Sequence, residues 1–132
     1  MTSMAAAIIF TGLIALLAIF QLALVFGAPL GRFAWGGQND VLPTRLRRGS
    51  IFAILLYVAF SIILLSASGI ITIAVLEPVG GLLCWMIVVY LSFGVVMNAL
   101  SRSKPERFVM TPVAAILAAC ALVVALGWPW IR

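Results

Sequence analysis

Four long apolar runs without a charged residue constrain this chain more than any other feature. They cover residues 4–26, 49–76, 79–100 and 108–126. About 20 helical residues are enough to cross the ~30 Å hydrocarbon core of a bilayer, because each residue adds 1.5 Å. Charged residues make up 8% of the sequence, against about 25% in soluble domains. The sequence therefore predicts an all-α polytopic membrane protein, in which residues 1–132 form a single bundle of four transmembrane helices with short loops.

Two loops, residues 27–48 and 101–107, hold almost all of the positive charge. Together they carry seven of the eight basic residues, and Arg132 in the C-terminal tail is the eighth. Loops rich in Arg and Lys stay on the cytoplasmic side of a membrane. We therefore expect both loops to be cytoplasmic and both termini to face outward, in the inner membrane of a bacterial cell.

The seven loop cations form a candidate surface for anionic lipid headgroups, opposed only by Asp40 and Glu106. Basic residues beside an anionic leaflet attract it, and this role explains the net charge of +5 without any nucleic-acid partner. The simpler alternative is that the positive charge of the loops only sets the membrane topology of the chain. A pocket for a phosphorylated ligand around Gly36-Gly37 is a third interpretation, although that pair alone is a weak motif. The seven cations are Arg32, Arg45, Arg47, Arg48, Arg102, Lys104 and Arg107.

Six polar side chains and four alanines inside the apolar runs are candidates for helix contacts. The polar ones either hydrogen-bond between helices or line a path, because an unpaired polar group in hydrocarbon is costly. The alanines repeat on one helical face and predict close packing, within the chain or between subunits. The polar set is Gln21, Tyr57, Ser61, Ser68, Tyr90 and Asn98, and the alanine set is Ala114, Ala118, Ala121 and Ala125.

Breaks in the apolar pattern predict where helices end. Gly27 is expected to stop the first helix, and the segment 66–69 to distort the second. Pro78 suits the first turn of the third helix, with Glu77 at the positive end of its dipole. Thr111-Pro112 resembles the start of the fourth helix, although its apolar run begins at residue 108.

The sequence contains few side chains that could act in catalysis. There is no histidine, and Cys84 and Cys120 lie inside apolar runs without a zinc or CxxC spacing. We expect no cofactor, no metal and no enzymatic activity. An enzyme acting on a lipid-linked phosphate would lack a nucleophile–base pair.

Two other function classes stay open. One is an accessory, assembly or lipid-interacting subunit, whose partners would be membrane lipids and either a second copy of the chain or another membrane protein. The other is a small oligomeric transporter or channel, with a path along the faces of Tyr57, Ser61 and Ser68 and of Tyr90 and Asn98.

Two segments, GRFAWGGQNDVLPTRLRRGS and VVMNALSRSKPERFVMTPVA, resemble those of small bacterial four-helix membrane proteins that have no assigned activity. The resemblance covers most of the chain and implies no catalytic residue. Small multidrug-resistance transporters are similar in length, but they place an essential glutamate in the first helix, where this chain has only Thr11 and Gln21. Fluoride channels are similar in size, but their Asn, Phe and Thr pore pattern is absent here.

Overall fold

The computed structural model describes residues 1–129, and in that range the chain is helical without strands. Each of the four long helices is long and apolar enough to cross a membrane, which confirms the predicted all-α polytopic fold. Arg132 lies outside the described residues. The four helices are α1 (Ser3–Val25), α2 (Thr44–Ala67), α3 (Gly80–Ala99) and α4 (Lys104–Leu126), and the short 3-10 turns are η1 (Gly31–Phe33), η2 (Trp35–Gly37) and η3 (Ala74–Leu76).

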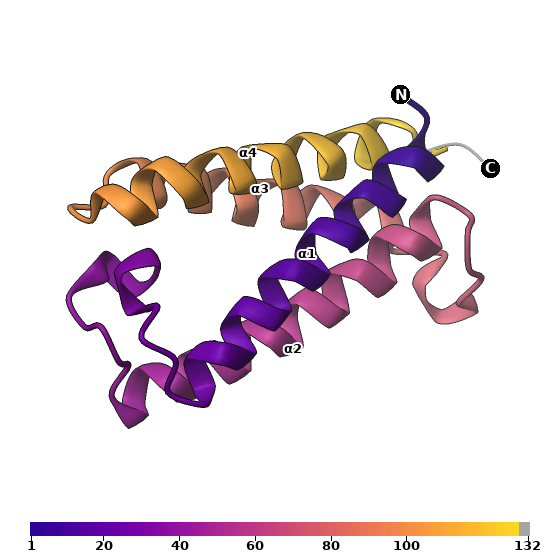
Figure 1. Ribbon diagram of the computed structural model, residues 1–132. Coiled ribbons are helices and arrows are strands. Elements are labelled where there is room, and N and C mark those ends of the chain that lie inside the picture. The colour runs from indigo at the N-terminus through magenta and orange to yellow at the C-terminus, as the bar shows by residue number, and fades with distance from the viewer. Residues whose placement is uncertain (130–132) are drawn as a thin grey trace.

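The helices form two antiparallel pairs, α1 with α2 and α3 with α4 (Figure 1). The pairs meet at the end where the N-terminus lies, and α1 also contacts α4. They diverge toward the opposite end, where the loop of residues 26–43 lies between them, beside the turn that joins α3 to α4 (Figure 1). We call this opposite end the loop end. It carries both basic loops.

The core lies along the line where the pairs meet. Phe10, Ile14, Leu64, Leu117 and Val124 are almost completely buried there, together with small residues that allow close approach. Large apolar side chains cover the outside of all four helices instead of polar ones, as expected where the solvent is lipid. Examples are Leu16, Leu55, Val89, Phe93 and Ile116.

The second helix differs from its predicted range of 49–76. It begins earlier, at Thr44, because Pro43 sits in extended backbone at the N-cap and its carbonyl accepts the first helical hydrogen bonds. It ends nine residues earlier, at Ala67, because Gly69 adopts a φ of +81° that glycine tolerates best. The amides of Gly69 and Ile70 then bond back to the carbonyls of Ser66 and Leu65, a Schellman stop.

The boundaries of the third and fourth helices also need correction. Pro78 precedes α3 instead of starting it, and Glu77 closes the η3 turn, so Glu77 does not cap α3. Helix α4 begins at Lys104, four residues before the predicted range of 108–126, and Pro112 lies inside it, so Thr111-Pro112 does not mark the start. Ser103 is the N-cap, and its hydroxyl accepts a hydrogen bond from the amide of Glu106 at 3.5 Å. Pro105 is tolerated in the first turn because no intrahelical partner is lost there.

Candidate functional site

The loop between α1 and α2 is fastened to α2 through Trp35. Its indole nitrogen donates a hydrogen bond to the hydroxyl of Ser50 at 3.2 Å, and Ser50 is fully buried. The ring lies against Gly49 so closely that a Cβ there would stand 2.6 Å from it. Trp35 holds a φ of +54°, an uncommon conformation for a bulky residue, which these contacts stabilise.

The same loop is fastened to α4 through Glu106. The Glu106 carboxylate accepts hydrogen bonds through Oε2 from the Gly36 amide at 3.1 Å and from the hydroxyl of Ser101. Nearby, the hydroxyl of Ser103 donates to the carbonyl of Arg32. The Gly36 amide is thereby occupied by a carboxylate of the chain itself, which counts against the interpretation of the glycine pair as a phosphate pocket.

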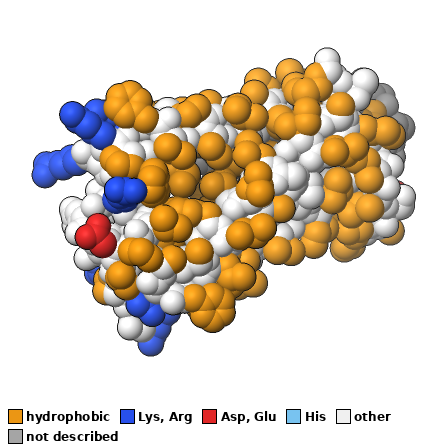
Figure 2. Space-filling view, in the orientation of Figure 1, with side chains coloured by type: hydrophobic (Ala, Val, Ile, Leu, Met, Phe, Trp, Pro, Cys, Tyr) orange, Lys and Arg blue, Asp and Glu red, His pale blue; other side chains and the backbone are white. Residues whose placement is uncertain are grey.

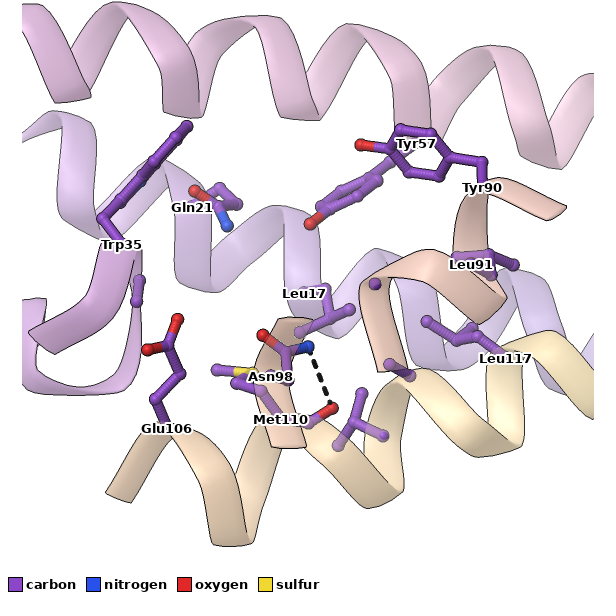
Figure 3. Close-up of a pocket in the computed structure, with 14 residues that line it drawn as sticks. Leu17, Gln21, Trp35, Tyr57, Tyr90, Leu91, Asn98, Glu106, Met110 and Leu117 are labelled. Atoms are coloured by element: carbon purple, nitrogen blue, oxygen red, sulfur yellow. Dashed lines mark hydrogen bonds between the residues drawn. The ribbon is translucent and has the colours of Figure 1, made fainter. Parts of the chain in front are cut away.

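Between the two helix pairs, beneath this loop, lies a cavity of about 200 Å³. Every long helix and the loop contribute to its wall (Figure 3). Its polar lining residues are Gln21 of α1, Tyr57 of α2, Tyr90 and Asn98 of α3 and Glu106 of α4, and the ring of Trp35 lies at the loop end. Leucines, alanines, Met110, Val113 and Gly94 complete the lining.

Two side-chain donors at the cavity are used within the chain, whereas two side-chain acceptors there receive no hydrogen bond. The side-chain nitrogen of Asn98 donates to the carbonyl of Met110 at 3.5 Å (Figure 3), and Trp35 donates to Ser50. Gln21 is 9% exposed, and its Oε1 has no hydrogen-bond partner within residues 1–129. Glu106 is 7% exposed, and both of its hydrogen bonds use Oε2, which leaves Oε1 free of hydrogen bonds within the same range. The cavity therefore has spare acceptor capacity beside a carboxylate.

Four of the six polar residues singled out from the sequence line this cavity, and two do not. Gln21, Tyr57, Tyr90 and Asn98 come together from three helices. Ser61 lies in a shallow groove between α1 and α2 on the outside of the bundle. Ser68 donates its hydroxyl to the carbonyl of Leu65 and takes part in ending α2. Tyr57 also borders this groove, whereas Ser68 lies apart, so Tyr57, Ser61 and Ser68 do not line one continuous path.

All seven loop cations lie at the loop end, where Figure 2 shows the blue side chains gathered. Five are exposed, namely Arg32, Arg45, Arg48, Arg102 and Lys104, and the other two, Arg47 and Arg107, are partly buried. In the described part of the chain none of these cations forms an ion pair. Arg32 and Arg107 stack on their neighbouring phenylalanine rings at 5.1 and 5.3 Å.

Arg47 has a structural role that the sequence did not indicate. Its Nε donates to the carbonyl of Leu42 at 2.8 Å. Its guanidinium also lies against Gly27, where an added Cβ would stand 3.3 Å from a guanidinium nitrogen. Arg47 thus ties the end of α1 to the start of α2.

The four alanines of α4 face the interior of this chain. Ala121 and Ala125 are fully buried, Ala114 nearly so, and Ala118 is partly buried against the same core. Their small side chains let α4 approach the neighbouring helices. Cys84 and Cys120 are both buried free thiols.

The sequence did not reveal that Glu106 has a central role in this site. On the sequence alone Glu106 is a counter-charge within the basic loop surface, whereas the carboxylate is buried and points into the cavity (Figure 3). The Ser-x-x-Glu spacing of Ser103 and Glu106 marks a helix start, and it could have placed Glu106 in the first turn of α4 but not in the cavity. Nothing in the local pattern indicated that Trp35 would reach Ser50.

Comparison of the chain with protein-family models, with curated proteins and with solved structures gives no match.

Proposed function

We propose that this chain is a non-enzymatic, lipid-interacting protein of a bacterial inner membrane, whose loop end binds anionic headgroups from the cytoplasmic side. The observation that supports the proposal most directly is the separation of charges at that end. Glu106 is buried and hydrogen-bonded internally, so Asp40 remains as the one exposed acidic side chain near five exposed cations in the described part of the chain. On the exposed surface of the loop end, basic residues therefore outnumber acidic ones five to one.

The expected strength of this interaction is modest per residue and large in sum. Each Lys or Arg beside an anionic leaflet contributes about 1 kcal/mol, which salt screens beyond a Debye length. Cations without an intramolecular partner keep their charge available for headgroup phosphates. Arg47 contributes less, because it is committed to the Leu42 carbonyl.

Native mass spectrometry with phosphatidylglycerol and phosphatidylcholine tests the proposal. We expect preferential retention of the anionic lipid, and a loss of that preference when Arg45, Arg48, Arg102 and Lys104 are all replaced by Gln. The matched control replaces the three arginines by Lys, which keeps the charge. Equal retention of the two lipids by the unmodified protein, or an unchanged preference in the Gln variant, would contradict the proposal.

The orientation is part of the same proposal and has its own test. Single cysteines at the exposed positions Gln38 and Lys104, in a variant lacking Cys84 and Cys120, should resist an impermeant thiol reagent in intact cells. A cysteine at exposed Val75, at the opposite end, should react. Labelling of the first two positions from outside would reverse the topology.

A small transporter or channel is the second candidate function, favoured by the polar cavity between the helix pairs. Its path would pass Tyr57, Tyr90 and Asn98 but not Ser61 or Ser68. A flux assay in liposomes separates it from the first candidate. An accessory role with a second copy or another membrane protein predicts a stable complex on purification in mild detergent.

A further inference from the structure

We propose that the cavity between the helix pairs is a binding site for an amphipathic primary ammonium compound, with the ammonium group held between Glu106 and Gln21. The inference does not depend on the basic surface. It rests on the composition of the cavity wall, on two acceptors left without donors, and on the way out of the cavity toward lipid.

The hydrogen-bonding pattern favours a ligand that donates hydrogen bonds. Gln21 Oε1 is buried without a hydrogen-bond partner within residues 1–129, and Glu106 accepts its hydrogen bonds through Oε2 alone. The donors of Trp35, Gly36, Ser101 and Asn98 are already used. A buried acceptor without a partner costs free energy that an incoming N–H group recovers. An ammonium group supplies three N–H donors and accepts none.

The charge of the cavity wall favours a cationic ligand. Glu106 is the only charged residue among the described lining residues, and none of the seven loop cations lines the cavity. Three aromatic rings, those of Trp35, Tyr57 and Tyr90, add negatively polarised faces that attract an ammonium group. An anion would meet a carboxylate and unpaired acceptors, and a neutral alcohol would leave the carboxylate uncompensated.

The position of Tyr90 indicates that the ligand has an apolar part as well as an ammonium group. Tyr90 is 48% exposed and packs edge-on against Phe60, with ring centroids 5.2 Å apart. It lines the inner cavity and also an apolar groove on the outside of α3 that includes Trp85 and Phe93. An ammonium group in the cavity can therefore continue into an alkyl chain that leaves past Tyr90 and lies in this groove. Entry from the membrane also avoids the repulsive basic surface.

Two glycines allow a test that leaves every polar group of the site in place. A Cβ added to Gly94, which lines the cavity, or to Gly12, which lies on the outside of α1, meets no atom within 4 Å. Gly94→Leu fills the cavity from α3, and Gly12→Leu is the matched control for the same change in a membrane helix. Glu106→Gln removes the charge alone.

Calorimetric titration of the protein in phosphatidylcholine nanodiscs with n-octylammonium, and with n-octanol as the neutral probe, measures the interaction. We expect saturable binding of one octylammonium per chain, no matching signal for octanol, loss of binding in Gly94→Leu and unchanged binding in Gly12→Leu. Glu106→Gln should weaken binding about tenfold or more, since hydrogen bonds to charged groups are the stronger ones.

Equal binding of octanol and octylammonium would overturn the proposal, and so would equal binding by the Gly94→Leu and Gly12→Leu variants. Because Glu106 also holds the loop, Glu106→Gln risks a folding defect, whereas Gly94→Leu keeps the loop contacts. Nanodiscs containing phosphatidylethanolamine distinguish two sources of the ligand. Competition with octylammonium would identify an amine-bearing phospholipid as the occupant, and unchanged affinity would identify a free amphipathic amine.

Discussion

Replacing Gly37 by Ala should undock the first loop from α4, whereas the same change at Gly36 should not. Both glycines have positive φ values, 69° and 80°, so either alanine adopts a left-handed conformation that costs roughly 1–2 kcal/mol. They differ in their surroundings. A Cβ at Gly37 would stand 2.3 Å from the Cβ of Ser103 and 2.9 Å from the Arg32 carbonyl oxygen, while a Cβ at Gly36 meets no atom within 4 Å.

The collision adds a second cost at Gly37 only. Overpacking of this kind costs typically 1–3 kcal/mol, so Gly37→Ala should lose about 2–5 kcal/mol in total and Gly36→Ala about 1–2. Because Ser103 is the N-cap of α4, the structure relieves the collision most easily by moving the loop away from Ser103 and Glu106.

Two measurements separate these outcomes. Unfolding in mixed detergent and SDS micelles gives the stability difference between the variants. Trypsin cleavage after the exposed Arg32 reports whether the loop is docked, and we expect it to be faster in Gly37→Ala than in Gly36→Ala or the unmodified protein. Equal destabilisation together with equal cleavage in the two variants would refute the docked arrangement of the loop against α4.

Three further predictions follow from burial. Ala121→Leu should lower stability in detergent by about 1–3 kcal/mol, because Ala121 is fully buried, whereas Ala119→Leu on the outside of α4 should change it little; equal effects would place this face of α4 in lipid. Cys84 and Cys120 should react with a membrane-permeant thiol reagent only after unfolding in SDS, and rapid labelling of the native protein would contradict their burial. Arg47→Gln should cost about 1 kcal/mol through loss of its bond to the Leu42 carbonyl, and unchanged stability would make that contact incidental.

The sequence by itself determined the class of fold. Runs of about 20 apolar residues leave the helix as the structure that satisfies every backbone group in lipid, so four helices followed from composition and length. It also located the stop after α1 and the weak point at residues 66–69, because glycine and proline act through local backbone geometry. The presence of both basic loops at one end followed from the even number of spans between them.

Only the tertiary structure decided what the polar residues do. Gln21, Tyr57, Tyr90 and Asn98 are far apart in sequence, and hydrophobic periodicity does not fix which faces of apolar helices meet when all faces are apolar. The cavity exists because the helix pairs diverge and the loop bridges them through Trp35 and Glu106. Those contacts join residues 15 and 70 positions apart, where local propensity carries no information. The same bridging separated Glu106 from the basic surface and made it a buried acceptor.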